Sequence, residues 1–266
     1  VEDPRYNQLF IMPAYNYNIY DGITIGSKFY NKAVLRKPFQ YKITPMWALK
    51  STKLVGSGSV LYKKMPEFGN LYFYRVGFSG SYYSYDSDLF YKRFSPFASV
   101  GFRDSKDLRN NKKHIINIRN ITVDRDKNPN VALESPNYSV FDINYVYSNP
   151  NLINYYRASV DYQISADFSK ISTTLNYRKL FNNNRKIDIR LFTGIFIKNN
   201  TKLDDHYFSF ALDRPTDYLF DFNYYGRSDA SGLFSQQLII AEGGFKSKLQ
   251  PAFSNTWMAT LNLSCL

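Results

Sequence analysis

The feature that most constrains the fold is the strict alternation of apolar and polar side chains along residues 153–168, INYYRASVDYQISADF. The apolar set of alternate positions consists of Tyr156, Ala158, Val160, Tyr162, Ile164, Ala166 and Phe168. Successive side chains of a strand point to opposite faces, so this period of two predicts one long strand between an apolar and a polar environment. Strands in soluble sandwiches are usually about 5 or 6 residues long. A strand that crosses an outer membrane needs an apolar band of about 9–11 residues, which this stretch supplies.

The same alternation recurs through the chain and predicts the fold class. Clear examples are FQYKITPMWALK at residues 39–50, ISTTLNYRK at residues 171–179 and KIDIRLFTGIFIK at residues 186–198. We predict an all-β protein, an antiparallel up-and-down transmembrane β-barrel with about 12–14 strands. Residues 1–8 are predicted to be a linker and residues 9–266 the barrel domain. Ser169-Lys170 is predicted to be a two-residue turn, and residues 236–245 a strand.

The composition is compatible with a membrane barrel and excludes membrane-spanning helices. The chain holds 24 Tyr and 22 Phe, and barrels place aromatic residues in girdles at both membrane interfaces. No stretch approaches the 18 consecutive apolar residues that a membrane helix requires. Cys265 is the single cysteine, so an internal disulfide is excluded.

The ends of the sequence lead us to expect a piece of a longer protein. Bacterial barrels of one chain use even numbers of strands, and their last strand commonly ends in an aromatic residue, whereas this chain stops at Ser264-Cys265-Leu266. We therefore expect a fragment of a larger barrel, incomplete at its C-terminal end. The mixed, charged start VEDPRYNQLF is not a signal peptide, so an export signal is expected upstream or removed.

The charge balance points to an anionic lipid surface as the partner. The formal net charge is +12, from 34 Lys and Arg against 22 Asp and Glu. Apart from RNNKKH at residues 109–114, the basic residues are scattered along strands and do not form the compact patch expected for nucleic acid. We expect contact with outer-membrane lipid and lipopolysaccharide in a bacterial outer membrane, and no nucleic-acid partner.

The residues that usually carry catalysis or bind metal are nearly absent. His114 and His206 are the only histidines, and neither lies near Cys265 in sequence. A zinc site or a hydrolytic triad needs a cluster that this sequence does not provide. The glycine-containing pieces at residues 56–58 and 241–244 lack the Lys-Ser/Thr of a phosphate loop and are better explained as bulges or close packing. We expect no cofactor, no metal and no enzymatic activity in this chain.

Two sets of residues are candidates for a functional role. The first set consists of charged residues on predicted polar, lumen-facing positions: Lys42, Arg157, Asp161, Asp167, Arg178, Asp188 and Arg190. Opposite charges on neighbouring strands are expected to pair and hold a narrow lumen shut. In a wide pore they would set ion selectivity, and they could also form a merely solvated wall. The second set is Gly226, Arg227, Ser228 and Asp229, within the long aperiodic loop at residues 212–232. This loop is expected to pack on its own aromatic residues or to plug the pore, with a rim active site as the alternative.

Several stretches resemble a known family. They are YDGITIGSKFYN at residues 20–31, KPFQYKITPMWALKSTKLVGSGSVLY at residues 37–62 and GRSDASGLFSQQLIIAEGGFKS at residues 226–247. They resemble a Bacteroidetes outer-membrane β-barrel domain found C-terminal to aminopeptidase N-like (gluzincin) zinc metallopeptidase domains, and the resemblance covers nearly the whole chain. It implies an outer-membrane location, further strands beyond Leu263 and a preceding peptidase domain. The zinc motif H-E-x-x-H is absent here, so no catalytic residue is carried over.

The function expected from these observations is that of a non-catalytic barrel, which anchors a preceding metallopeptidase domain at the outer membrane. One alternative is a stand-alone porin-like or solute-transport barrel, which the polar faces and the basic surplus favour. Planar-bilayer conductance would separate these two. A soluble β-sandwich binding module for carbohydrate is a third interpretation, and it predicts solubility without detergent.

Overall fold

The structure is a computed structural model, and it describes all residues except 1, 2, 4, 5, 33, 36, 68, 108, 128–136, 202–205, 214, 223–239, 248, 251 and 266. The described residues form strands, turns and irregular segments, and none of them is helical. Across this part of the chain, no helix has the length and apolar character needed to cross a membrane.

Twelve strands form one large sheet. They are β1 (Phe10–Asn18), β2 (Gly22–Tyr30), β3 (Phe39–Ala48), β4 (Leu54–Lys64), β5 (Leu71–Asp86), β6 (Leu89–Arg103), β7 (Lys113–Arg125), β8 (Tyr138–Pro150), β9 (Asn154–Ile164), β10 (Phe168–Leu180), β11 (Lys186–Asn199) and β14 (Trp257–Cys265). Two short strands, β12 (Phe210–Ala211) and β13 (Phe253–Ser254), pair separately with each other.

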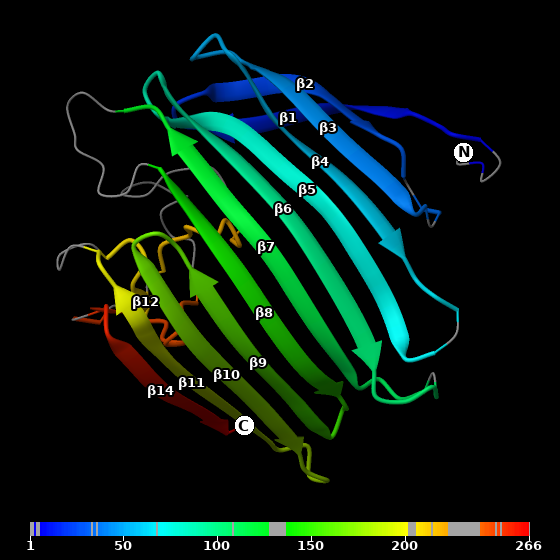
Figure 1. Ribbon diagram of the computed structural model, residues 1–266, viewed down its shortest axis with the longest axis vertical. Helices are drawn as coiled ribbons and strands as arrows, with labels where there is room; N and C mark the ends of the chain where they lie inside the picture. The colour runs from blue at the N-terminus through cyan, green and yellow to red at the C-terminus, as the bar shows by residue number, and fades with distance from the viewer. Residues whose placement is uncertain are drawn as a thin grey trace.

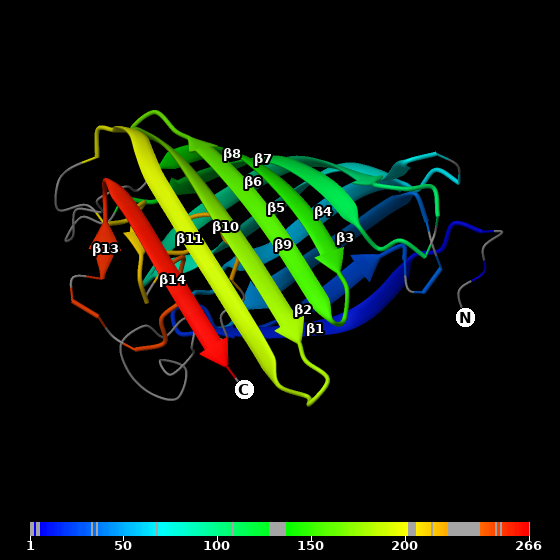
Figure 2. The same cartoon turned by 90° about the horizontal axis from the view of Figure 1, so that it is seen from below.

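The topology of the large sheet is an antiparallel meander. Every strand pairs with the next one in sequence, except that β11 pairs with β14 across the long connection that contains β12 and β13. The predictions of an all-β chain and of up-and-down antiparallel strands are therefore confirmed. The sheet curves strongly: β1–β4 lie at the top of the view in Figure 1 and behind β9–β11 and β14 when the molecule is seen from below in Figure 2. Among the described residues, β1 pairs only with β2 and β14 only with β11.

Three local predictions are wrong, the third for the part of it that the structure describes. Residues 153–168 are not one strand, because β9 ends at Ile164 and a turn at residues 165–167 leads into β10. The expected turn at Ser169-Lys170 lies inside β10, where both residues are buried. Their polar character suggested a turn, but Lys170 is enclosed by aromatic rings that come from distant parts of the sequence. Residues 240–245 of the predicted strand at 236–245 are not strand, and residues 236–239 lie outside the described residues.

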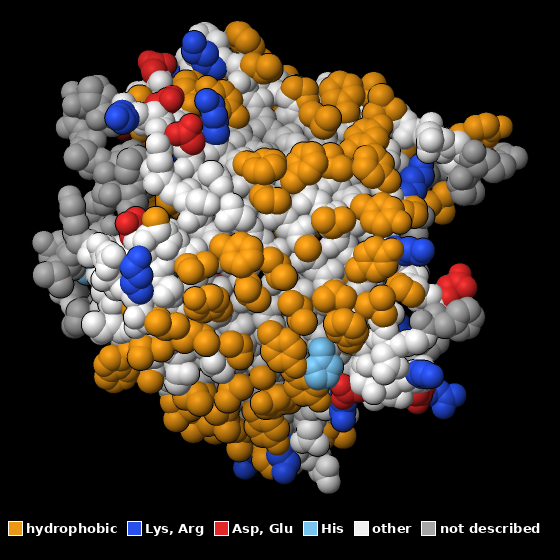
Figure 3. Space-filling view, in the orientation of Figure 1, with side chains coloured by type: hydrophobic (Ala, Val, Ile, Leu, Met, Phe, Trp, Pro, Cys, Tyr) orange, Lys and Arg blue, Asp and Glu red, His pale blue; other side chains and the backbone are white. Residues whose placement is uncertain are grey.

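The strand register aligns the apolar side chains of successive strands on the convex face. One row crosses the sheet through Phe39, Tyr62, Val76, Ala98, Ile118, Ile143, Tyr162, Ile171, Ile195 and Trp257. Exposed large apolar side chains are common on this face, with Trp257 at 65% and Ile43 at 51%. Figure 3 shows hydrophobic side chains across the middle of the visible face and charged ones toward its margins.

Charged side chains at convex positions of the strands are confined to the strand ends. Each of them lies within four residues of an end of its strand: Lys64, Asp86, Lys92, His114, Asp124, Lys179 and Lys198. The central part of the convex face is therefore free of charged side chains and mostly apolar, with Asn120, Thr173 and Thr193 as uncharged polar exceptions. The polar alternate positions face the concave side.

The larger part of the buried core lies on the concave side, under the connection between β11 and β14, and a separate buried cluster consists of Met46, Ala48, Val55 and Phe90 on β3, β4 and β6. We call the described parts of this connection, residues 206–222 and 240–254, the inner segment. Phe208 and Tyr218 of the inner segment pack with Phe168 and with apolar residues of β7 and β8. Phe210 packs with Phe192 and Met258 in a second cluster. The inner segment thus covers the concave face of the second half of the sheet.

Candidate functional site

A ladder of polar side chains crosses the concave face over four neighbouring strands. Ser99 on β6 donates from Oγ to Asn117 Oδ1 at 2.7 Å, and Asn117 Nδ2 donates to Asn144 Oδ1 at 3.1 Å. Asn144 Nδ2 then donates to Asp161 Oδ1 at 2.6 Å. The register places these residues opposite one another on β6, β7, β8 and β9, so the ladder follows from strand pairing. Each amide accepts on one side and donates on the other, which orients all donors toward the Asp161 carboxylate.

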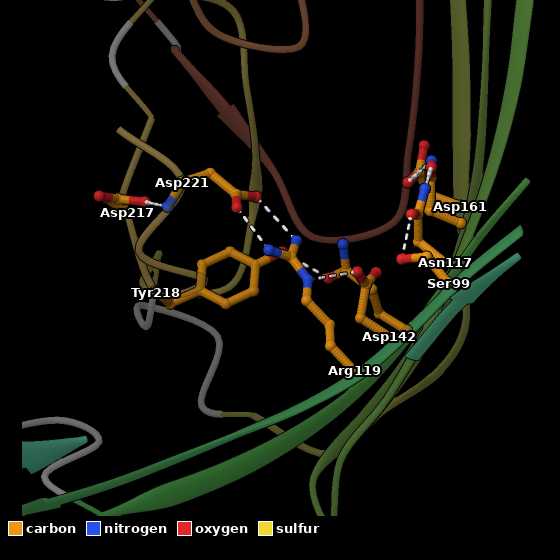
Figure 4. Close-up of polar contacts among 10 residues, drawn as sticks. Ser99, Asn117, Arg119, Asp142, Asp161, Asp217, Tyr218 and Asp221 are labelled. Carbon is orange, nitrogen blue, oxygen red and sulfur yellow. Dashed lines mark hydrogen bonds and ion pairs between the residues drawn. The ribbon is translucent and has the colours of Figure 1, made fainter. Parts of the chain in front are cut away.

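Arg119 on β7 joins the sheet to the inner segment. Its Nε donates to Asp142 Oδ2 at 2.8 Å, and its Nη1 and Nη2 donate to the two carboxylate oxygens of Asp221 at 2.5 and 2.8 Å. Figure 4 shows the guanidinium between these two carboxylates. Asp142 is 2% exposed, so its charge depends on this partner. The two-point contact with Asp221 also fixes the orientation of the inner segment, because a planar guanidinium matches a carboxylate in only a few arrangements.

Tyr218 anchors the inner segment to two further strands. Its hydroxyl donates to Gln163 Oε1 on β9 at 2.6 Å, and its carbonyl accepts from the Tyr138 hydroxyl on β8 at 2.9 Å. Burial raises the pKa of Tyr218 well above its ordinary value, so the hydroxyl remains protonated and acts as a donor. Asp217 accepts hydrogen bonds from the backbone N–H groups of Asp221 and Phe222 at 2.7 and 3.2 Å. Burial raises the pKa of Asp217, and these two hydrogen bonds oppose that rise.

Lys170 on β10 lies in an aromatic enclosure beneath the inner segment. It is 3% exposed, and its Nζ donates to the Phe208 carbonyl at 2.7 Å. Four ring centroids lie 4.6–5.7 Å from this nitrogen: those of Phe168, Phe196, Phe210 and Tyr218. A buried ammonium group is costly unless it is compensated, and the faces of aromatic rings attract it. Lys170 therefore holds β10 and the inner segment together.

A cavity of about 560 Å³ lies between the concave face and the tip of the inner segment. The sheet contributes Arg75, Ser79, Arg93, Ser95, Phe97, Ser99, Asn117, Ile118, Arg119, Asp142, Asn144 and Asp161. The inner segment contributes Leu219, Phe220 and Asp221. The ladder and the Arg119 contacts form one side of this cavity. Arg75 and Arg93, with three serine hydroxyl groups, come from β5 and β6 on the other side.

Most of the charged residues predicted to face the lumen lie on the concave side. Arg157, Arg178, Asp188 and Arg190 line a second concave pocket, of about 470 Å³, beside β14. Arg178 Nε lies 3.8 Å from Asp188 Oδ1, and Lys186 Nζ lies 3.5 Å from Asp188 Oδ2. Opposite charges on neighbouring strands thus pair here along one wall, with both partners well exposed, and such pairs contribute little stability.

In the same pocket, Arg190 Nη1 donates to Asn262 Oδ1 at 3.2 Å. The remaining predicted residues differ from this group, and Asp161 belongs to the ladder. Lys42 lies on the concave face of β3, opposite Ser59. Asp167 does not face the concave side from a strand, because it is exposed in the turn between β9 and β10. The predicted loop residues Gly226, Arg227, Ser228 and Asp229 lie outside the described residues.

The sequence reasoning missed Arg119, Lys170 and Asp221 as site residues. β7 shows isoleucine on both of its faces, because Ile115 and Ile121 are concave while Ile116 and Ile118 are convex, and this hid the polar positions of the strand. Asp221 lies in an aperiodic loop, where no pattern distinguishes a contact residue from a solvated one. One sequence pattern could have predicted this site: Asn117 and Arg119 occupy alternate positions of one strand, as do Asp142 and Asn144 of the next strand, with which they pair.

The site has binding groups, but the described residues do not form a catalytic constellation. In this part of the chain, no cluster of three or more His, Cys, Asp or Glu side chains could hold a metal ion. His114 lies apart from the concave face, and its ring nitrogens are 2.5 Å from Asp104 Oδ1 and 2.7 Å from the Tyr145 hydroxyl. The concave face can bind charged groups and hydroxyl groups, and it can hold a segment in place. No protein-family model matches the chain, and neither the curated proteins nor the solved structures contain a match to it.

Proposed function

We propose that this chain is a transmembrane β-barrel of a bacterial outer membrane, and that it anchors a preceding metallopeptidase domain without being catalytic itself. The observation that carries the membrane part is the distribution of charge on the convex face. Every charged convex side chain of the strands lies within four residues of a strand end, and the centre carries no charge. A convex face in water has no reason to exclude charge from its centre, whereas lipid penalises charge most strongly at the midplane.

The height of the apolar surface supports the same proposal. Convex apolar positions on β9 run without interruption from Tyr156 to Ile164, which corresponds to about 27 Å along a strand. Strands of membrane barrels tilt by about 35–45°, which leaves about 19–22 Å along the membrane normal, close to the apolar band of about 25 Å in known barrels. Tyrosine and histidine rings gather near one end of the strands, where Tyr147 contacts His114 and Tyr156. Such a cluster is typical of an interfacial aromatic girdle.

The interior favours an anchor over an open pore. The inner segment is fixed to the concave face by Arg119, by the Tyr218 hydrogen bonds and by the Lys170 enclosure. A wide aqueous channel would leave these groups in water. Barrels whose lumen is filled by a segment of their own chain are a known alternative to water-filled porins. The peptidase part of the proposal rests on the resemblance of residues 20–31, 37–62 and 226–247 to barrel domains that follow such peptidases.

Substitution of a central convex residue by arginine tests the membrane location. We expect Ile143→Arg to lower the free energy of unfolding in lipid vesicles by about 2–4 kcal/mol, because position 143 would face the centre of the bilayer. Ser59→Arg, on the concave face of β4, is the matched control and should change stability by less than about 1 kcal/mol. Urea titration of both variants in vesicles gives the two values. If the purified chain stays monomeric in buffer without detergent and tolerates Ile143→Arg, the membrane proposal is wrong.

Two measurements separate the anchor from a transport barrel. We expect planar bilayers containing the chain to show no steady conductance, whereas regular open-channel events would favour the porin-like alternative. The reading frame upstream of Val1 is expected to encode an H-E-x-x-H zinc domain. Absence of such a domain would remove the peptidase part and leave the membrane part standing.

A further inference from the structure

The concave face of β1–β6 carries a surplus of positive charge, which among the described residues is opposed near Arg93 by Asp217 of the inner segment. Lysine and arginine side chains project from this face at Lys28, Lys42, Lys63, Arg75, Arg93 and Arg103. The only carboxylate in these six strands is Asp86, at the end of β5. Arg75 and Arg93 make no ion pair with a carboxylate of the described residues. The strands β7–β11, by contrast, carry aspartates that pair with the basic residues beside them.

Arg75 and Arg93 line the 560 Å³ cavity together with hydroxyl groups. The register of β5 with β6 places Arg75 opposite Ser99 and Arg93 opposite Ser81, and the pair Ser79–Ser95 lies between them. Serine pairs continue this row toward β3, where Ser59 is opposite both Ser79 and Lys42. This wall of the cavity therefore offers cationic and hydroxyl donors and no carboxylate acceptor.

The two guanidinium groups are held by rings, which leaves their N–H groups available. Arg93 lies over the Phe220 ring at 5.2 Å, and Arg75 lies over the Phe97 ring at 5.9 Å. Arg93 Nε is buried and has no hydrogen-bond partner among the described residues. An orphaned buried donor is destabilising, and a ligand that accepts a hydrogen bond from it offsets this cost. Ring contacts of this kind orient the guanidinium plane and leave the N–H groups at its edge free of the ring.

We propose that Arg75 and Arg93, with Ser79 and Ser95, form a binding site for a small anionic solute that bears a carboxylate or phosphate group. The arginine forks match the geometry of either group, and the serine hydroxyl groups donate to its remaining oxygens. The Asp221 carboxylate is engaged by Arg119 and closes the opposite side of the cavity without competing for the two arginines. This site lies between the concave face and the inner segment, and it does not depend on the membrane location.

Titration calorimetry on the folded chain in detergent tests the proposal, with inorganic phosphate and citrate as probes at low ionic strength. We expect saturable binding of at least one probe. Arg93→Gln and Arg75→Gln should each weaken it roughly tenfold, because each removes a charge-assisted contact. Arg93→Lys should retain part of the affinity, since it keeps the charge and loses the fork. Arg157→Gln, on the concave face of β9, is the matched control and should bind like the unmodified chain.

The possible outcomes separate the ligand sources and the two proposals. Tighter binding of phosphate identifies phosphate esters as the ligand class, and tighter binding of citrate identifies carboxylates. Equal weakening by Arg157→Gln and Arg93→Gln would reveal general electrostatic attraction and overturn a defined site, as would the absence of binding by both probes. Heat-modifiable migration of each variant on gels reports folding independently. A folded, membrane-inserted chain that binds neither probe contradicts this inference and leaves the proposed anchor intact.

Discussion

The concave faces of the two halves of the sheet are built from similar strands but are stabilised in different ways. The covered half, formed by β7–β11 and β14, carries Asp142, Asp161 and Asp188 among the basic residues of its concave face, and the inner segment packs on it. The basic half, formed by β1–β6, carries basic residues and serines on its concave face and no carboxylate there. Where aspartates lie beside arginines, the charged side chains form ion pairs and the inner segment fills the interior. Where they do not, the interior keeps an open, basic wall.

Alternation and register specify the sheet, whereas the positions of the carboxylates decide whether the charges of the concave face are paired internally. The covered half satisfies its charges internally, as Arg119 does with Asp142 and Asp221. The basic half has guanidinium groups whose partners must come from elsewhere. The two halves should therefore respond differently when a concave side chain is truncated.

The largest contrast is expected for buried aromatic residues. Phe168 is fully buried under the inner segment, so Phe168→Ala should lower the free energy of unfolding by about 3–5 kcal/mol through lost burial and a residual cavity. Phe97, a partly exposed ring on the basic half, is the matched position, and Phe97→Ala should cost less than half as much. Urea titrations in detergent micelles measure both values. Equal losses would mean that the basic half is filled as tightly as the covered half.

The second contrast concerns paired and unpaired arginines. Arg119→Met leaves the Asp142 carboxylate buried without its guanidinium, and we expect a loss of about 2–3 kcal/mol, because Arg119 itself is partly exposed. Arg93→Met breaks no ion pair between described residues and should change stability by less than about 1 kcal/mol. Adding Asp142→Asn to Arg119→Met should restore most of the loss. A failure of this rescue would show that the contact with Asp221, and not the buried charge, carries the effect.

Much of the sheet could be predicted from the sequence, because a period of two is a local signal that the twelve strands carry individually. The site could be predicted only in part. Asp161 and Arg190 lie on regular strands and were found, whereas Asp167 was misplaced because alternation runs on through the turn at residues 165–167. Lys170 was taken for a turn residue, since the rings of Phe196, Phe210 and Tyr218 that enclose it are distant in sequence. Long-range packing of an aperiodic segment leaves no local pattern to read.

The third contrast measures the contribution of the Tyr218 hydroxyl group separately from that of its ring. Tyr218→Phe removes the donor to Gln163 Oε1 and leaves the Tyr138 contact with the Tyr218 carbonyl in place. We expect a loss of about 1–2 kcal/mol, because a buried amide oxygen loses its hydrogen bond. Limited proteolysis of the inner segment should accelerate by the factor that this free-energy loss corresponds to. Hydrogen exchange in β3 and β4 should stay unchanged. Faster exchange in β3 would mean that the two halves unfold together.

The smallest expected effect is a pH dependence confined to the covered half. Burial raises the pKa of Asp217 in the folded chain above the ordinary aspartate value of about 3.9. A raised pKa in the folded state means that the protonated form is favoured there, so this residue's contribution to stability is complete below pH 3.9 or so and is lost as the pH rises through the raised value. The protection of residues 217–222 against hydrogen exchange should therefore weaken slightly as the pH rises from about 4 toward 6.

Asp217→Asn isolates this contribution from the other carboxylates, because position 217 no longer titrates while its single amide oxygen can still accept one of the two hydrogen bonds from the N–H groups of Asp221 and Phe222. The difference in protection between the unmodified chain and this variant should follow the titration of one group and should level off at a constant value below pH 4 or so. Asp86→Asn, at the end of β5 in the other half, is the control and should leave the protection of residues 217–222 unchanged. A difference that grows as the pH falls would mean that the two backbone hydrogen bonds outweigh burial, so that the Asp217 carboxylate stabilises the turn in its ionised form.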